Sequence, residues 1–341
     1  MRLRVGLIGL GRNWETRHRL ALRALSDRFE VRAVCEQVAH RAEIAAREFG
    51  ADAVDGFRAL VARSDIDAVL MLGAQWYGPL PIYAACEAGK DVYWAGALEL
   101  NAEEIKEVRR CVEQAGVAFV AELPRRLAPA TIRLKELIAT RLGKPRLLFC
   151  HHRFAAQPAT TNHAGATAHC DATRDLVELV DWCRYVVGKD PQSVLGLHHS
   201  APSGPVPDYE MMSLDFSLER KLGTDAVAQI SASRYLSLTW PEAITFRPPA
   251  ALQVACENGV AFIDLPSTLI WFDSAGRHME SLDTERPVDE QLLLRFHRAV
   301  TSLVQNVSSL NDAFMALSIV QAARESHETG ARMFFDEKPL A

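Results

Sequence analysis

The chain has 341 residues, of which 49% are hydrophobic and 24% charged, and its formal net charge at pH 7 is −5. This length exceeds one ordinary hydrophobic core and suits two, and the composition is typical of a soluble globular protein. No basic field favours nucleic acid, and no apolar run reaches the roughly 18 residues that a membrane helix needs. Arg2 and Arg4 interrupt the apolar N-terminus, and the cysteines form no CxxC pair. We therefore expect no secretory signal, disulfide framework or zinc ribbon, and a cytoplasmic location.

The first 122 residues alternate short apolar runs with helical patterns. The predicted strands are Leu3–Ile8, Val31–Cys35, Ala68–Leu72, Val92–Trp94 and Val117–Ala121, and the predicted helices are Trp14–Leu25, His40–Phe49, Pro79–Ala88 and Ala102–Gln114. Near-continuous apolar strands suit a parallel sheet that is buried on both faces. This rhythm predicts a doubly wound, Rossmann-type α/β domain over residues 1–122.

From residue 123 the rhythm changes. A helix over 130–139 and a strand over 146–154 lead into an aperiodic stretch, 155–170, for which we predict a long loop. A helix over 171–187 follows, then strands near 192–199, 211–218, 226–234, 251–256, 259–263 and 268–272, and closing helices near 289–304 and 312–329. The pattern predicts an α+β domain over 123–341 with an open, mostly antiparallel sheet, whose last helices pack back on the first domain.

Glycines and one carboxylate indicate a dinucleotide site. Gly9 and Gly11 lie between the first strand and the first helix, where small residues let a pyrophosphate approach the helix N-terminus. Glu36 ends the second strand, where a carboxylate accepts hydrogen bonds from ribose hydroxyls and repels a 2′-phosphate. We therefore expect NAD, with NADP as the alternative that Arg41 would favour. A Rossmann domain that has lost its ligand stays open as the other interpretation.

The third position of the glycine fingerprint holds Trp14. An indole there prevents the close helix–strand packing that glycine allows. Either the first helix stands off from the sheet, or the ring lies over the cofactor groove.

Several segments together resemble the glucose-fructose oxidoreductase / inositol dehydrogenase / rhizopine-catabolism (Gfo/Idh/MocA) family. The segments that carry the resemblance are Val5–Arg12, Val34–Glu36, Arg41–Gly50, Ala88–Tyr93, Arg126–Pro129, Asp181–Gly188 and Glu325–Gly330. The resemblance implies an N-terminal NAD(P) domain and a C-terminal open sheet with one face lining the active site. The other face would build a homodimer or homotetramer, and the substrate would be a sugar or cyclitol.

The chain departs from this family at its usual proton carriers. Where the family shows Glu-Lys-Pro after the fifth strand, this chain has the three residues 95–97, Ala-Gly-Ala. Where it shows Thr-Pro and then histidine after the fourth strand, Gly73, Ala74 and Gly78 stand here. On the helix that leads into Gly188, the family's Asp and His are replaced by Arg174 and Glu178.

A polar stripe on that helix supplies the remaining candidates for catalytic residues. Arg174, Glu178, Asp181 and Tyr185 follow the helical period and predict one face, either toward the interdomain cleft or toward solvent. If the stripe faces the cleft, Glu178 is the best acid/base candidate, with Asp181 beside it. Arg174 and Arg126 would supply positive charge, and two arginines favour an acidic ligand such as a sugar acid.

Other polar and aromatic residues favour a function less strongly. His163, His169, Cys170 and Asp171 are metal-capable types without metal-ligand spacing, so we expect no metal. Trp76 and Tyr77 predict either a stacking wall for the cofactor or loop packing.

The sequence leaves three functions open. The first is a nicotinamide-dependent oxidoreductase with atypical catalytic residues; the second is an inactive cofactor or sugar sensor; the third is redox-assisted elimination or hydrolysis of a sugar. The residues expected at the cofactor are Gly9, Gly11, Arg12, Asn13, Trp14, Glu36, Gly73, Ala74, Trp76, Ala95 and Gly96.

Overall fold

The structure is a computed structural model of the full chain. It describes residues 1–73, 77–95, 100–156, 164–201, 207–217, 223–237, 240, 242, 246, 249–282, 286–302 and 308–335, and the side chains of 155–171, 237 and 308 are not among those described. The predicted cofactor residues Ala74, Trp76 and Gly96 therefore lie outside the described residues.

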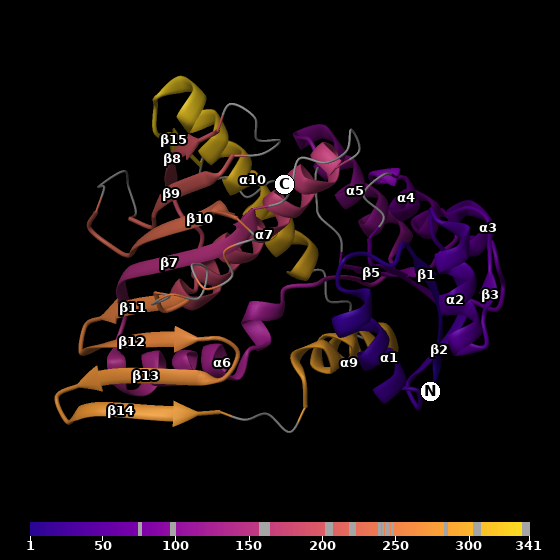
Figure 1. The fold of residues 1–341 in the computed structure, drawn as a ribbon, viewed down its shortest axis with the longest axis horizontal. Coiled ribbons are helices and arrows are strands. Elements are labelled where there is room, and N and C mark those ends of the chain that lie inside the picture. The colour runs from indigo at the N-terminus through magenta and orange to yellow at the C-terminus, as the bar shows by residue number, and fades with distance from the viewer. Residues whose placement is uncertain are drawn as a thin grey trace. The chain divides into compact units, whose positions relative to one another are not determined.

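The chain forms two compact units (Figure 1). The first consists of Met1–Pro124 and Arg286–Met315, and the second of Arg125–Glu285 and Ala316–Ala341. The segment 286–315 packs with the N-terminal unit through aromatic contacts: the ring of Phe296 lies 5.5 Å from that of Tyr93. The division into 1–122 and 123–341 that the sequence suggests stays a prediction.

A six-stranded sheet, parallel throughout, organises the first unit. Its spatial order is β3-β2-β1-β4-β5-β6, the order of a dinucleotide-binding Rossmann fold. The strands are β1 Leu3–Ile8, β2 Phe29–Cys35, β3 Asp52–Ala53, β4 Ala68–Met71, β5 Asp91–Trp94 and β6 Phe119–Ala121. Side chains on β1 and β4 are buried along almost their whole length, as the continuous apolar runs predict.

Helices cover this sheet in two groups. Their bounds are η1 Trp14–His18, α1 Arg19–Ala24, α2 Ala39–Phe49, α3 Phe57–Val61, α4 Leu80–Glu87, α5 Ala102–Ala115 and α9 Val288–Thr301. Contacts join α3, α4 and α5 in one group, and α1 and α9 in the other. The short elements β3 and α3 were not predicted, because two and five residues carry too little periodicity to recognise.

The second unit is built on a nine-stranded sheet in the order β14-β13-β12-β11-β7-β10-β9-β8-β15. The strands are β7 Pro145–Ala156, β8 Ser193–His199, β9 Tyr209–Asp215, β10 Val227–Ser237, β11 Leu252–Cys256, β12 Gly259–Asp264, β13 Thr268–Asp273, β14 Gly276–Ser281 and β15 Met333–Phe334. Among the described strands of this sheet only β7 and β10 pair in parallel, so the open, mostly antiparallel sheet expected from the sequence is confirmed.

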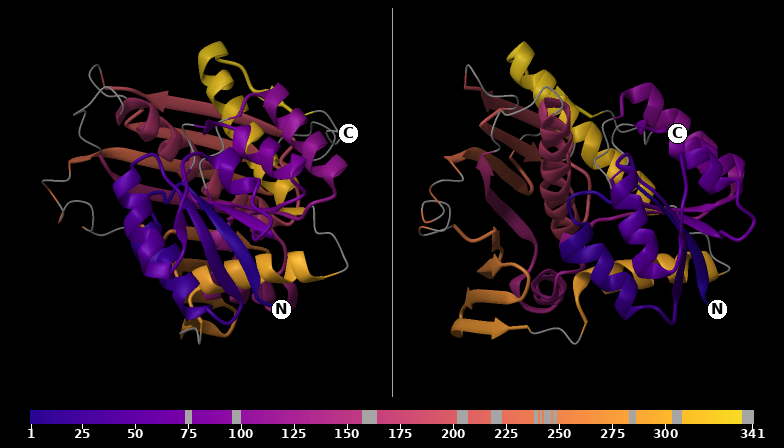
Figure 2. Two further views of the ribbon diagram at one scale, coloured as in Figure 1. Left: turned by 90° about the vertical axis from the view of Figure 1, so that its right-hand side faces the viewer. Right: turned by 45° about the vertical axis from the view of Figure 1, so that its right-hand side comes forward.

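Helices cover one face of this sheet (Figure 2, right view). They are η3 Pro124–Leu127, α6 Pro129–Leu137, η4 Ile138–Leu142, α7 Ala164–Val187 and the later residues of α10 Ser308–Thr329. The helix α7 corrects the predicted loop over 155–170: β7 runs to Ala156 and residues 164–170 are helical. The small residues there lack an apolar period, yet they continue a helix that the later apolar stripe anchors. No helix among the described residues is long and apolar enough to cross a membrane.

Candidate cofactor and substrate sites

Two glycine turns meet backbone to backbone at the carboxyl ends of β1 and β4. Gly9 and Gly11 have φ angles of 65° and 67°. A Cβ on Gly11 would lie 2.2 Å from the Leu72 carbonyl oxygen, and one on Gly73 would lie 2.3 Å from the Gly11 Cα. Only glycine fits either position, because a side chain on one turn would collide with the backbone of the other.

Glu36 is tied to the same turn. Its carboxylate accepts hydrogen bonds from the backbone N–H of Leu10 at 2.7 Å and of Gln37 at 2.9 Å, and the residue is 9% exposed. Each carboxylate oxygen uses one lone pair in these bonds and keeps another. The end of β2 is thereby fixed against the glycine turn.

Trp14 packs into the unit. Its side chain is buried, 4% exposed, with its ring 5.9 Å from that of Phe49 at the end of α2. The turn of helix that begins at Trp14 is π-helical, which is wider than an α-helical turn. This geometry accommodates an indole where the fingerprint usually has glycine.

The other predicted cofactor residues are spread around the turn. Arg12 is exposed, and the Asn13 carbonyl accepts the backbone N–H of Arg17 at 3.0 Å. Ala95 follows β5, is buried, and donates its N–H to the Met71 carbonyl at 2.9 Å. Tyr77 packs edge-on against the Phe57 ring at 4.8 Å, and its role beside a cofactor stays a prediction.

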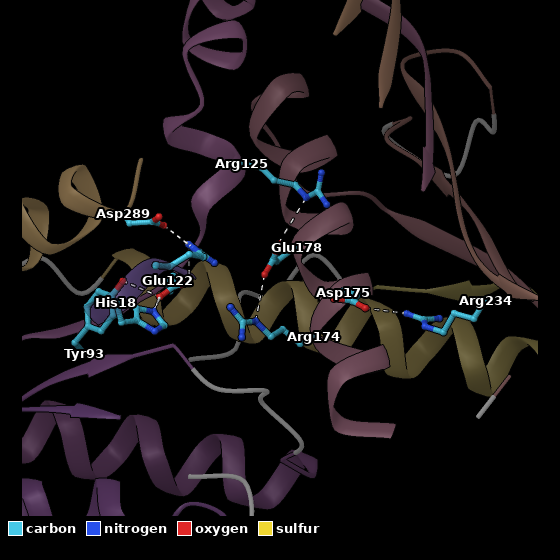
Figure 3. A network of polar contacts seen from close by, with 10 residues as sticks. His18, Tyr93, Glu122, Arg125, Arg174, Asp175, Glu178, Arg234 and Asp289 are labelled. Carbon is cyan, nitrogen blue, oxygen red and sulfur yellow. Dashed lines mark hydrogen bonds and ion pairs between the residues drawn. The ribbon is translucent and has the colours of Figure 1, made fainter. Parts of the chain in front are cut away.

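A buried polar cluster at the carboxyl ends of β5 and β6 was missed by the sequence analysis (Figure 3). Glu122 directly follows β6, and its carboxylate accepts bonds from His18 Nε2 at 2.7 Å and from the Tyr93 hydroxyl at 2.9 Å. Arg17 lies 3.0 Å from the same carboxylate and 2.6 Å from Asp289 of α9. The sequence did contain a sign of this cluster. Glu122 directly follows a fully apolar strand, and a charged residue at such a buried place needs polar partners.

Burial keeps the phenol of this cluster protonated. It raises the pKa of Tyr93 well above its ordinary value, and the Glu122 carboxylate raises the pKa further. Tyr93 therefore remains a hydrogen-bond donor throughout the ordinary pH range.

In the second unit, the predicted stripe on α7 brings Arg174 and Glu178 together. The Arg174 Nε lies 3.2 Å from the Glu178 carboxylate, and the Nε of Arg125 lies 3.7 Å from its other oxygen (Figure 3). The Arg125 guanidinium also stacks 5.2 Å from the Trp182 ring centroid. Arg125 was not predicted, because its position on η3 has no periodic relation to α7.

Asp181, one turn after Glu178 on the same helix face, has different arginine partners. Arg126 binds it through two nitrogens, one of them at 2.7 Å, and Arg184 lies 3.5 Å away. The Arg126 guanidinium also stacks over Tyr185 at 5.1 Å. Arg126 is thus the partner of Asp181, and Arg125 is the second cation beside Glu178.

A further charged network joins α7 to the sheet. Arg234 of β10 lies 3.3 Å from Asp175 and 3.6 Å from Glu210 of β9. Arg324 of α10 also lies 3.1 Å from Glu210. Beside this network, burial and, to a smaller extent, the positive charge of Arg125 lower the pKa of His152 to about 4.

The face of the nine-stranded sheet opposite the helices exposes large apolar side chains. Leu147 of β7, Leu197 of β8, Tyr235 of β10 and Met279 of β14 are 45%, 51%, 56% and 60% exposed. On this face His151 hydrogen-bonds Ser231 of the neighbouring strand at 2.7 Å.

Among the described residues, no group of three or more histidine, cysteine and acidic side chains is placed to hold a metal ion. His163 and the side chains of His169, Cys170 and Asp171 lie outside the described residues.

Comparison with known proteins places these observations in a family context. Residues 3–123 match the sequence profile of an oxidoreductase family with an NAD-binding Rossmann fold. The chain is 30% identical over 171 residues to inositol 2-dehydrogenase 3 of Saccharopolyspora erythraea and 31% identical over 148 residues to dehydrogenase aclE of Aspergillus oryzae. These matches cover 49% and 40% of this chain and the same shares of the two relatives, so each spans less than half of the relative's length.

The fold is shared over almost the whole chain. The crystal structure of an aldose-aldose oxidoreductase from Caulobacter crescentus superposes with a TM-score of 0.83, covering 98% of this chain and 100% of that one, at 14% sequence identity.

Proposed function

We propose that the chain is a Gfo/Idh/MocA-type oxidoreductase that oxidises or reduces a hydroxyl or ketone of a sugar, cyclitol or sugar acid with NAD, because residues 3–123 match the NAD-binding domain of that family. The observation that carries this proposal is the contact between Gly11 and Gly73. Two chain turns that touch without side chains allow the close approach of a pyrophosphate, which binds at the carboxyl edge of the sheet in this fold.

The residues present fit the nicotinamide cofactor. Gly9 and Gly11 would face the pyrophosphate, and the lone pairs that Glu36 keeps would accept the ribose hydroxyls. A 2′-phosphate beside the Glu36 carboxylate would be repelled, which favours NAD over NADP. When bound, the cofactor supplies the hydride acceptor or donor.

The second unit supports an acidic substrate. Arg125 and Arg174 both approach Glu178, so two guanidinium groups lie beside one carboxylate there. Paired guanidinium groups suit a ligand carboxylate or phosphate better than a neutral sugar. Arg126 lies on Asp181 instead.

Calorimetry tests the cofactor proposal. We expect purified protein to bind NAD at least tenfold more tightly than NADP, and Glu36→Gln to reduce this preference. Equal heats for both cofactors would contradict the role of Glu36, and no heat from either would overturn the oxidoreductase assignment. A turnover screen of gluconate and galacturonate against glucose and myo-inositol then tests the substrate class, and faster turnover of the neutral compounds would reject the sugar-acid proposal.

A non-catalytic sensor is the second candidate, favoured by Ala95. This residue stands where the family pattern begins Glu-Lys-Pro, and it has no protic side chain. NAD binding without turnover of any polyol would support the sensor.

We further propose that the protein assembles through the outer face of the nine-stranded sheet into a homodimer or homotetramer. The exposed apolar side chains of Leu147, Leu197 and Met279 support this, since such a surface favours burial against another protein. Analytical ultracentrifugation of wild type and Leu197→Lys checks it: we expect the variant to sediment as a smaller species.

A further inference from the structure

One nitrogen in the buried cluster of the first unit has no partner. His18 Nδ1 has almost no accessible surface and no hydrogen-bond partner among the described residues. The His18 side chain is 3% exposed. An unpaired buried polar atom costs free energy, so such atoms are uncommon in folded proteins and call for an explanation.

The chemistry of the cluster fixes which nitrogen carries the proton. An ionised carboxylate only accepts hydrogen bonds, and Glu122 faces donors from Arg17, His18 and Tyr93. His18 Nε2 therefore donates its hydrogen to Glu122. In the neutral ring, Nδ1 then holds an unused lone pair, which is a basic site.

The cluster lies at the edge of the sheet where a catalytic residue of this fold is expected. Tyr93 and Glu122 lie on β5 and directly after β6, and His18 ends the helical turn that follows the glycine turn of β1. All three are at the carboxyl edge of the parallel sheet, where doubly wound folds bind their ligands. Residues 95–97, which stand where the family has its lysine motif, follow β5 directly and offer no proton carrier.

We propose that His18 is the general base of the reaction, and that Glu122 is the positioning residue that fixes its tautomer. This inference rests on the proposed oxidoreductase function. A carboxylate that holds one imidazole nitrogen while the other takes a proton is a recurring arrangement for general-base catalysis.

The step balances as an alcohol oxidation. The O–H bond of the substrate carbinol breaks and its proton forms a bond to His18 Nδ1, while a bound nicotinamide would accept the hydride that the breaking carbinol C–H bond releases. The carbinol becomes a ketone, NAD is reduced, and the proton leaves the imidazolium for water. In the reverse direction the imidazolium donates this proton to the ketone oxygen.

The charges around His18 suit this role. Glu122 stabilises the imidazolium, and Tyr93 stays protonated and supplies no competing base. Arg17 opposes the imidazolium charge, but it is shared with Asp289 of α9, which reduces this effect.

Nitrogen NMR on the wild-type protein tests the tautomer and the location together. The protein is labelled with 15N-histidine, the His18 signals are assigned with His18→Asn, and NAD binding is followed by calorimetry on the same sample. We expect Nδ1 to be unprotonated at pH 8 and its resonance to shift when NAD saturates the protein. A protonated Nδ1, or an unmoved resonance in protein that binds NAD, overturns the role of His18. Absence of any binding heat overturns the proposed function instead.

Kinetics provide the second test, on whichever polyol the screen identifies. We expect His18→Asn to lower kcat at least 100-fold without a comparable loss of NAD affinity. Glu122→Gln should lower kcat and displace the acidic limb of the pH profile, since the ring loses its anionic partner. The control is His297→Asn, which alters another buried histidine of the first unit, one whose Nε2 lies 2.9 Å from the Met1 carbonyl oxygen, and it should keep the wild-type kcat and pH profile. Equal activity of His18→Asn and wild type overturns the inference.

Discussion

The two polar clusters of this protein differ in how completely their charges are matched. Around Glu122 in the first unit, three donors converge on one buried carboxylate, and an imidazole nitrogen is left over. On α7 in the second unit, Asp181 and Arg126 bind each other through two hydrogen bonds. A matched pair holds a fold together, whereas an unmatched basic atom is available for chemistry.

The stripe on α7 shows the same contrast within one helix. Asp181 is almost fully buried and held by Arg126, while Glu178 lies between Arg125 and Arg174 at longer distances. Helical spacing places both carboxylates on one face, but it does not distinguish the structural one from the available one. Substitution of each carboxylate in turn tests that distinction, first through stability and then through binding.

The largest expected effect is on Asp181. Asp181→Asn removes the charge that Arg126 pairs with, and breaking a buried pair from one side costs about 3–5 kcal/mol of unfolding free energy. Urea denaturation checks this, with Glu178→Gln as the matched control on the same helix face, for which we expect a smaller loss because its arginine contacts are longer, at 3.2 and 3.7 Å. Equal losses in the two variants would remove the distinction between the two carboxylates.

The glycine turn is next. Gly11→Ala places a methyl group 2.2 Å from the Leu72 carbonyl oxygen in a left-handed conformation. We expect a loss of about 3 kcal/mol in stability and at least a tenfold weaker affinity for NAD. Gly50→Ala is the control, because its φ of 66° is nearly the same and nothing lies within 4 Å of the added Cβ. It should cost only about 1 kcal/mol and leave NAD binding unchanged, and similar results for both variants would show that conformation, not crowding, sets the effect.

A smaller effect concerns pH. The pKa of His152 is lowered from 6.5 to about 4 in the folded protein. Between these two pH values the unfolded chain therefore binds a proton at His152 that the folded chain does not. The stabilising contribution is complete above pH 6.5 and is lost as pH falls toward 4, by about 2 kcal/mol after allowance for the exposed part of the ring. His152→Asn should show a smaller fall in stability between pH 7 and pH 5 than wild type. A parallel fall in both proteins would assign the acid sensitivity to other groups.

The smallest expected effect sharpens the role of Glu178. Glu178→Gln removes the anion shared by Arg125 and Arg174, so an acidic ligand meets less repulsion. We expect severalfold tighter binding of gluconate and unchanged binding of glucose, measured by calorimetry in the presence of NAD. Equal changes for both ligands would mean that the two arginines do not bind the acid.

The sequence by itself determined the two kinds of sheet and most of the elements that build them. Continuous apolar runs predict parallel strands buried on both faces, and β1 begins and ends where the run Leu3–Ile8 does. The same local rules located Gly11 and Glu36, because a glycine turn and a strand-terminal carboxylate are recognisable within a few residues. The local rules failed over residues 164–170, where helix formation depends on tertiary packing and the sequence has no apolar period.

Only the tertiary structure decided which polar groups meet. Glu122, His18 and Tyr93 come from three separate elements of the sheet and its first helix, and Arg125 reaches Glu178 from η3. Periodicity describes one helix or strand at a time, so it carries no information about contacts between elements far apart in the chain. The pairing of charges, and the nitrogen that this pairing leaves over, arise from the way the folded chain brings those elements together.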